Sequence, residues 1–402
     1  MATRSYAILR DMGQVSTADP FGLRARGSAA VRPMVLAPPE PRVEVADLAP
    51  NDVGAVARDP SVAAVAPIMP TRLVMPFEVA AADAPTAAWG ISAVKADESP
   101  FTGAGTRVAV LDTGIDRDHP AFAGIAVIEQ DFSGTGDGDR QGHGTHCAGT
   151  ILGRDVENTR IGVARGVTSL LVGKVLGDDG SGDSDMIFRG IQWALQHNAD
   201  VISMSLGFDF PGLVQRLVSR GWPADLATSV ALEAYRGNLR MFDALMEMVE
   251  ARNAFGQGTV LVAAAGNESR RDQNPDHEIA VSIPAAAQGI VSVGALAAAA
   301  DGLRVAPFSN TFPQLSAPGV GVLSARAGGG VRALSGTSMA TPHVAGVAAL
   351  WWEALRAAPV NASSLAVLSK LLATARPAGF ATGTDPADTG LGIVTAPLGL
   401  TQ

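Results

Sequence analysis

Cysteine is nearly absent from this sequence, because the 402 residues contain Cys147 alone. One cysteine excludes an internal disulfide framework and fits a reducing compartment, although many secreted bacterial enzymes also lack disulfides. Basic residues are also few, 30 against 39 acidic ones, which gives a net charge of −9. A chain with this balance lacks the electrostatic footprint of a nucleic-acid or anionic-lipid binder, so neither partner is expected.

Long apolar runs are missing as well. No stretch approaches the roughly 18 apolar residues that span a bilayer. The start, MATRSYAILRDMGQV, has no apolar run of about 7–15 residues behind a basic segment, so it does not resemble a secretory signal. We therefore expect a cytoplasmic protein without a membrane partner, with secretion as the alternative.

The composition that is present is that of a soluble globular chain, with 47% hydrophobic and 17% charged residues. The length indicates one large domain and a smaller one. Residues 5–10, 42–46 and 62–73 are predicted strands and residues 50–58 a short helix, which together make a small α+β unit within residues 1–80. Residues 76–90, rich in Ala and Pro, are predicted to form an exposed linker that runs to about residue 88.

From residue 106 onward, short β-branched runs alternate with helical patterns. The predicted strands are RVAVLD, SLLVGKV, DVISMSLG, TVLVAAAGN and GIVSVGAL, and the predicted helices include residues 183–197 and segments that start near 144 and 338. This alternation predicts an α/β fold of three layers, α/β/α, with a mostly parallel central sheet. Ligands on such sheets bind beyond the carboxyl ends of the strands.

Three chemically distinct side chains are predicted at those ends. Asp112 closes the strand VAVLD, His143 stands between two glycines before a helix, and Ser338 begins a helix that accepts Pro342 close to its first turn. A serine hydroxyl becomes a good nucleophile when an imidazole accepts its proton and a carboxylate orients that imidazole. Asn267, which follows a strand and a glycine, offers an amide donor to the oxyanion that would form.

The motifs VLDTGID, GHGTHCAGT, AAAGN and SGTSMATPHVAG resemble the Asp, His, oxyanion-Asn and Ser motifs of the subtilisin and proteinase K family. The resemblance covers the chain from about Trp89 to its end and places the peptidase domain at residues 89–402. It implies a serine endopeptidase that forms an acyl-enzyme on Ser338, with protein or peptide substrates and no cofactor required for catalysis. A monomer is expected.

The resemblance also implies two backbone edges that pair with an extended substrate and a pocket beside them. The residues implied are Gly180, Ser181, Gly182, Ser205, Leu206, Gly207, Ala264, Ala265 and Gly266. Residues 1–80, and ARDPSVAAVAP most clearly, resemble the family's propeptide, which implies a zymogen that cuts itself and is inhibited by its own pro-segment. Acidic residues 178, 179, 183 and 185 surround one edge and predict a preference for basic residues upstream of the cut bond, with a solvated turn as the alternative.

Two departures from the family pattern concern calcium and an insertion. Ala121 follows Pro120, where many relatives carry the carboxylate ligand of a calcium site. Asp155, Glu157 and Asn158 offer oxygen ligands for a structural calcium, and a solvated acidic loop is the alternative. Residues 208–257 exceed the family's usual length and read helical over 227–255, either as extra packing or as a flap that restricts the cleft.

Several rival interpretations remain at this stage. A catalytically silent peptide-binding module, or a peptide ligase or macrocyclase, could use the same fold and groove. A metal pair of His143 and His146 has no third ligand at suitable spacing, so no metal site is predicted there, and Cys147 is expected to pack as a small hydrophobe. The D-T-G pairs at 112 and 388 mimic an aspartic protease, but the second lies in a predicted turn.

Overall fold

The structure is a computed structural model that describes residues 3–13, 38–78, 88–256, 258–359 and 361–399. The largest sheet in the described residues has eight strands. In spatial order its strands are β14 (Gly302–Val305), β13 (Ile290–Ala299), β12 (Val260–Ala264), β10 (Val201–Met204), β6 (Arg107–Asp112), β8 (Ser169–Lys174) and β7 (Ala126–Asp131), and β15 (Leu315–Pro318) also pairs with β13. All of these pairs are parallel except β13 with β14.

Side chains alternate across this sheet and bury both of its faces, as in a parallel sheet covered by helices. Val108 and Val110 of β6 lie in one apolar core with α3 (His143–Leu152), α7 (Thr337–Ala357) and α8 (Ser364–Ala373). The intervening Ala109 and Leu111 lie in a second core with α4 (Ser184–Gln196) and α6 (Ala224–Ala251). The predicted three-layer α/β fold is confirmed.

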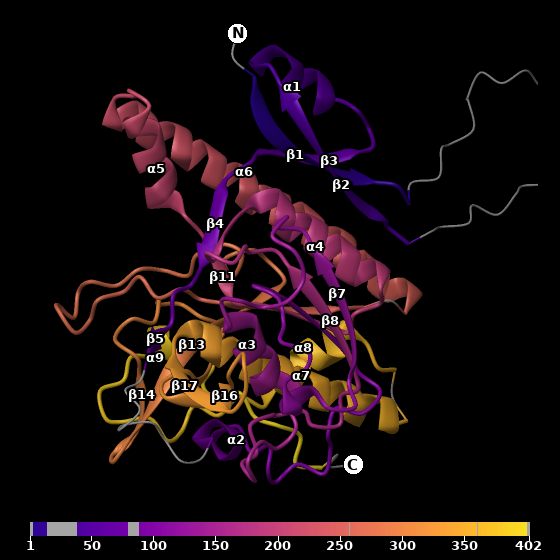
Figure 1. The fold of residues 1–402 in the computed structure, drawn as a ribbon, viewed down its shortest axis with the longest axis vertical. Helices are drawn as coiled ribbons and strands as arrows, with labels where there is room; N and C mark the ends of the chain where they lie inside the picture. Colours follow the sequence, from indigo (N-terminus) through magenta and orange to yellow (C-terminus); the bar gives the residue numbers. More distant parts are fainter. Residues whose placement is uncertain (1–2, 14–37, 79–87, 257, 360, 400–402) are drawn as a thin grey trace, which may run out of the picture.

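A small antiparallel sheet from the N-terminal part of the chain lies against α4 and α6 (Figure 1). Its strand order is β2 (Pro41–Leu48), β1 (Arg4–Asp11) and β3 (Val62–Pro67), with α1 (Pro50–Val56) between β2 and β3 in the chain. The Val43 N–H donates to Gln192 Oε1 at 2.7 Å, and Asn238 Nδ2 donates to the Pro67 carbonyl at 2.9 Å. The N-terminal sheet is therefore tied to both helices by hydrogen bonds as well as apolar packing.

Two sequence expectations between residues 62 and 90 are wrong. Residues 62–73 form two strands, because β3 ends at Pro67 and β4 (Pro70–Leu73) crosses to a different sheet between β9 (Ser181–Asp183) and β11 (Leu206–Phe208). Residues 77 and 78, expected in an exposed linker, form β5 (Phe77–Glu78) and pair with β17 (Val331–Ser335). Residues 79–87 of that expected linker lie outside the described residues.

The long segment after residue 208 is helical, as expected, and covers one face of the molecule. It comprises α5 (Phe210–Ser219), α6 and η3 (Arg252–Phe255). Buried side chains of α6 pack on the second core, where the rings of Phe188 and Phe242 lie 4.5 Å apart between centroids. Helix α6 also contacts β3 and β1, so this segment packs between the central sheet and the N-terminal sheet.

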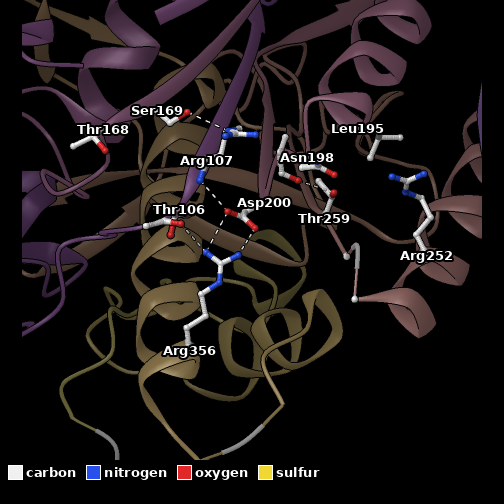
Figure 2. Close-up of a pocket in the computed structure, with 14 residues that line it drawn as sticks. Thr106, Arg107, Thr168, Ser169, Leu195, Asn198, Asp200, Arg252, Thr259 and Arg356 are labelled. Atoms are coloured by element: carbon white, nitrogen blue, oxygen red, sulfur yellow. Dashed lines mark hydrogen bonds and ion pairs between the residues drawn. The ribbon is translucent and has the colours of Figure 1, made fainter. Parts of the chain in front are cut away.

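The remaining elements are short and close the molecule around the sheet. They are α2 (Trp89–Ala93), η2 (Pro120–Phe122), β16 (Val322–Ala325) and α9 (Pro386–Thr389). No helix in the described parts of the chain has the length and apolar character needed to cross a bilayer. A polar cavity of about 430 Å³ opens at the amino ends of β6, β8, β10 and β12, where Arg356 pairs with Asp200 (Figure 2). Asp112 lies at the other, carboxyl end of β6.

Candidate active site

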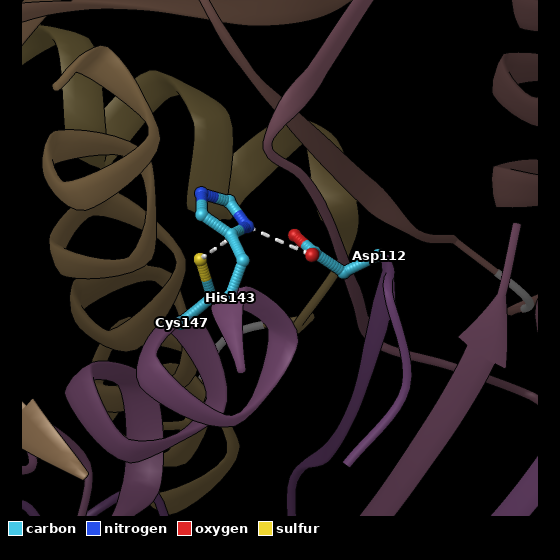
Figure 3. Close-up of side chains that lie close together, drawn as sticks. All are labelled: Asp112, His143 and Cys147. Carbon is cyan, nitrogen blue, oxygen red and sulfur yellow. Dashed lines mark hydrogen bonds and ion pairs between the residues drawn. The ribbon is translucent and has the colours of Figure 1, made fainter. Parts of the chain in front are cut away.

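Asp112 and His143 form a buried pair at the carboxyl end of the sheet. Asp112 is the last residue of β6 and His143 the first of α3, and both side chains are fully buried. His143 Nδ1 lies 2.8 Å from Asp112 Oδ1, as Figure 3 shows. Within the described residues, the opposite ring nitrogen, Nε2, has no hydrogen-bond partner. A carboxylate that accepts from Nδ1–H fixes the tautomer in which Nε2 is free to take a proton.

The turn before α3 explains why His143 is held at this point. Gly142, the residue before the helix, has a φ of 85°, which a residue with a Cβ rarely adopts. Its N–H donates to Asp139 Oδ1, while Oδ2 of the same carboxylate accepts from both the N–H and the hydroxyl of Thr145. Asp139 thus ties the residue before His143 to the first turn of α3.

Electrostatics favour a protonated His143 in this closed arrangement. Burial by itself lowers the pKa of His143, but the charge of Asp112 and the hydrogen bond to it raise the pKa well above its ordinary value. Two other buried histidines behave in the opposite way, because burial lowers the pKa of His146 to about 3 and that of His343 to about 4. Of these three buried histidines, His143 is the one whose surroundings stabilise the protonated imidazole.

Ser338 is the second residue of α7 and is fully buried. It follows Gly336 at the helix start, so its N–H lies in the first turn, where helix N–H groups have no partner within the helix. Pro342 is inside α7, deeper than the first turn, and it lacks the N–H that would bond the Ser338 carbonyl four residues earlier. That carbonyl instead accepts from Ser205 Oγ at 3.1 Å and from Cys147 Sγ at 3.4 Å.

Asn267 is oriented by the residue that precedes Ser338. Its Oδ1 accepts from the Thr337 N–H at 2.9 Å and from the Thr337 hydroxyl at 2.8 Å. Because both acceptor sites of the amide oxygen face α7, the amide nitrogen points away from Thr337, and it donates to the Met75 carbonyl at 3.1 Å. The donor of Asn267 and the hydroxyl of Ser338 therefore meet the same short segment of chain.

That segment, residues 70–78, lies as an added strand across the site. Strand β4 pairs antiparallel with β11 on one side and with β9 on the other, so that Arg72 lies opposite both Gly207 and Ser181. The Leu73 N–H continues the pairing and donates to the Gly180 carbonyl at 2.8 Å. A Cβ on Gly182 would lie 2.6 Å from the Val175 carbonyl oxygen, so this edge has no room for a side chain. Strand addition of this kind is a general mode of peptide recognition.

The seated segment then passes Ser338. Ser338 Oγ donates to the Val74 carbonyl at 3.1 Å and to the Ser205 carbonyl at 3.3 Å. The Val74 side chain is buried, and a Cβ placed on Gly207 would lie 3.4 Å from its Cγ2. Beyond Pro76, β5 pairs with β17, so that the chain is held on both sides of Ser338.

The buried Asp112–His143 pair also has to be considered as a possible place for a metal ion. Asp112, His143 and Cys147 are the group of described residues whose ligand atoms lie close enough to share an ion. Burial raises the pKa of the Cys147 thiol, and its Sγ is already hydrogen-bonded to the Ser338 carbonyl, which disfavours the thiolate that a metal needs. In the loop that carries Asp155, where the sequence offers ligands for calcium, both carboxylate oxygens of Asp155 accept hydrogen bonds from Arg165. A calcium ion would have to compete with this guanidinium for Asp155.

The sequence-predicted residues gather around the seated segment. Asp112 and His143 contact each other, and Cys147, 3.7 Å from His143 Nδ1, links that pair to the carbonyl of Ser338. The two predicted edges flank β4 as strands β9 and β11, and Ala264, Ala265 and Gly266 are buried beside Asn267. Asp388 lies apart in α9 and pairs with Arg271, so it forms no carboxylate pair with Asp112.

Sequence reasoning missed the residues that fill the site. The sequence predicts no role for Val74 or Met75, whose carbonyls contact Ser338 and Asn267, nor for β5. The run LVMPF was a signal for them, because it is unusually apolar for an exposed linker. Ser335 of β17, which lies opposite Phe77, is the first residue of the motif SGTSMATPHVAG, but the motif by itself did not predict this pairing.

Comparison with known proteins gives a consistent result. The pattern of the family described as "Subtilase family" matches residues 103–392. An "Intracellular serine protease" of Paenibacillus polymyxa is 36% identical over 257 residues, which cover 62% of this chain and 67% of that protein. The "Major intracellular serine protease" of Bacillus subtilis (strain 168) is 35% identical over 274 residues, 65% of this chain and 73% of that protein. "Subtilisin" of Bacillus pumilus is 35% identical over 270 residues, 65% and 83% respectively.

Proposed function

Since the chain belongs to the subtilase family and is a serine-type endopeptidase, we propose that it cuts proteins through an acyl-enzyme on Ser338. The observation that carries this assignment is the buried contact of 2.8 Å between His143 Nδ1 and Asp112. This contact leaves Nε2 free to act as the base. It is supported by the position of Ser338, whose hydroxyl lies at hydrogen-bond distance from the carbonyl of a peptide segment seated in the groove.

In the proposed reaction, His143 Nε2 takes the proton of the Ser338 hydroxyl as Oγ attacks the carbonyl carbon of the substrate. Asp112 accepts from Nδ1–H and stabilises the imidazolium that forms. The negative oxygen of the tetrahedral intermediate accepts from Asn267 Nδ2 and from the Ser338 N–H. The imidazolium then gives its proton to the departing amine, and water, activated by the same imidazole, hydrolyses the ester.

A fluorophosphonate probe tests this assignment, because it reacts only with an activated serine. We expect wild-type protein to be labelled at Ser338 and to hydrolyse casein, and Ser338→Ala to do neither. The matched control is Ser369→Ala, which should behave as wild type. Ser369 is exposed on α8, and its hydroxyl donates to the Leu365 carbonyl. Labelling at another serine, or casein hydrolysis by Ser338→Ala, would overturn the assignment.

We also propose that the protein is made as a self-processing zymogen. Residues 1–80 are the inhibitory pro-unit, joined by a linker to about residue 88, and residues 89–402 form the peptidase domain with its helical insertion at about 208–257. Support comes from the pairing of residues 70–73 with both edges, β9 and β11, and of residues 77–78 with β17. The names of two relatives further support an intracellular location.

Self-processing predicts a cut between about Pro70 and Trp89 in wild type and an intact chain in Ser338→Ala. Intact mass and N-terminal sequencing of both proteins, purified in parallel, measure this. Processing of purified Ser338→Ala without added protease would contradict the proposal. So would a wild-type enzyme that is fully active with residues 1–80 uncut.

A further inference from the structure

The segment seated in the groove carries one charged side chain within β4, that of Arg72. Arg72 precedes by two residues the carbonyl that accepts from Ser338 Oγ, and its backbone is paired with Gly207 and Ser181 as an extended peptide's would be. Its side chain therefore occupies the place that a side chain at the same position of a substrate would take. What it contacts there reports on the substrate that the groove accepts.

Arg72 faces two carboxylates of the enzyme body. Its Nη1 lies 3.2 Å from Asp209 Oδ1 and its Nη2 lies 3.8 Å from Glu268 Oε1. The Arg72 side chain is 44% exposed, while those of Asp209 and Glu268 are 21% and 38% exposed. The two acids come from different segments of the chain, one directly after β11 and the other directly after Asn267.

Both carboxylates are held in place by contacts that do not involve Arg72. Asp209 is the N-cap of α5 and its Oδ1 accepts from the Gly212 N–H at 3.1 Å. Glu268 Oε2 accepts from Asn310 Nδ2 at 2.8 Å, which leaves Oε1 directed to the groove. A pair of preorganised acids loses little conformational entropy when it binds a cation.

Other acids near the groove are already engaged by residues of the same chain. Asp178 accepts from Lys174 Nζ at 2.6 Å, Asp179 accepts from the N–H and the hydroxyl of Ser181, and Asp185 accepts from Arg189 at 2.8 Å. Three of the four acids from which a basic preference is expected, residues 178, 179 and 185, are thus already engaged within the chain, and that preference stays a prediction.

We propose that Asp209, assisted by Glu268, forms a substrate subsite for a cationic side chain, two residues before the residue whose carbonyl Ser338 attacks. The inference rests on the proposed function of Ser338 and names the class of substrate that this groove prefers. Because the contacts are partly exposed, the preference for Arg over an uncharged isostere is about twofold to tenfold in kcat/KM at low salt. It weakens in 1 M salt, where the screening length falls to about 3 Å.

Three acetylated p-nitroanilides test the subsite. They carry the sequence of residues 70–74 with Arg, Gln or Glu at the position of Arg72, and they are hydrolysed by the full wild-type protein, whose active sites are counted in a separate sample with the fluorophosphonate. All three compete equally with the seated segment, so the ratio of their kcat/KM values reports the subsite alone. We expect Arg to exceed Gln, and Gln to exceed Glu.

Asp209→Asn is the decisive variant, because asparagine keeps the helix cap and removes the charge. It should reduce the ratio of Arg to Gln toward one, Glu268→Gln should reduce it less, and Asp179→Asn, the same change on the other edge, should leave it unchanged. Equal hydrolysis of the three anilides by wild-type enzyme, from a preparation in which a parallel sample is labelled at Ser338, or a ratio that survives in Asp209→Asn, would overturn the subsite and leave the function intact. Absence of both labelling and hydrolysis would overturn the proposed function, and the subsite with it.

Discussion

Asn267 and Ser338 hold two successive carbonyls of the seated segment, since the amide of Asn267 donates to Met75 while the hydroxyl of Ser338 donates to Val74. In acyl transfer, one carbonyl group must receive both the nucleophile at carbon and the donors at oxygen. The seated segment divides these contacts between neighbouring residues. Strands β4 and β5 anchor it on either side, so it cannot easily slide by one residue to bring the contacts together.

Removal of Met75 should therefore convert the seated segment into a better substrate. In a chain that combines deletion of Met75 with Pro76→Ala, we expect the bond after Val74 to be cut at least about tenfold faster than either bond of Met75 is cut in Pro76→Ala alone, because one carbonyl can then meet both groups. The substitution of Pro76 prevents the deletion from creating a Val–Pro bond, whose leaving nitrogen would differ. Intact mass at timed intervals after refolding measures the rates. Met75→Ala keeps the length of the segment and is the control. If it is cut as fast as the deletion, the side chain and not the register is responsible.

A second expectation concerns the amide of Asn267. Asn267→Ala removes a donor aimed at charge that develops only in the transition state, so it should lower kcat by about 10²–10³, the loss measured for such a donor in a subtilisin. KM should change little. Asn267→Asp provides a comparison, because its carboxylate can still accept from the Thr337 N–H and hydroxyl but cannot donate. A raised KM with an unchanged kcat in the alanine variant would rule out the oxyanion role.

Much of this site could be predicted because its motifs are local. Asp112 ends an apolar strand, while His143 and Ser338 begin helices after glycine-containing turns, and each of these signals lies within a dozen residues of sequence. The seating of residues 70–78 could not be read in this way. Thr71 pairs with Phe208 and Gly182, more than a hundred residues away, and such pairing depends on the folded groove. A short strand that pairs only with distant segments carries no local signal for its partners.

The raised pKa of His143 leads to a third prediction, on the pH dependence of turnover. His143 must be neutral to accept the proton of Ser338, so activity should rise with pH through the pKa of His143, and the acid limb should lie above the ordinary value near 6.5. Asp112→Asn removes the charge that raises this pKa, so the limb should move to lower pH while kcat falls by about 10⁴, as in other triads. Profiles of kcat/KM from pH 5 to 10 measure both effects. Asp118→Asn, on an exposed loop, should keep the wild-type limb.

Cys147 gives a fourth prediction. Its side chain is fully buried, and Sγ lies 3.7 Å from His143 Nδ1 and 3.4 Å from the Ser338 carbonyl oxygen. A mercurial that reaches it would displace both neighbours and inhibit, although slowly, because burial also raises the pKa of the thiol. Cys147→Ala should keep at least about half of the wild-type kcat/KM and lose the sensitivity. Persistent inhibition of the alanine variant would show that the reagent acts elsewhere.

The last prediction concerns how tightly the N-terminal sheet stays bound to the peptidase domain after processing. Helix α6 contacts β3, and Asn238, which is fully buried, donates to the Pro67 carbonyl at 2.9 Å. We expect the cut N-terminal fragment to stay bound and to co-elute with the enzyme in size-exclusion chromatography. Asn238→Ala removes the donor of this hydrogen bond to the half-buried Pro67, which costs about 0.5–1.5 kcal/mol, so the fragment should dissociate about twofold to tenfold faster and activity should appear sooner.

Thr228→Ala is the matched control for this change. Thr228 lies on the same helix, its hydroxyl bonds the Ala224 carbonyl at an exposed site, and it has no contact with the N-terminal sheet in the described hydrogen bonds. Dissociation is followed by fluorescence of a dye attached to the fragment, and activity by hydrolysis of an anilide. Equal dissociation in wild type and Asn238→Ala would mean that α6 does not retain the fragment. In that case the strand pairing of residues 70–78 would alone determine how long the enzyme stays inhibited.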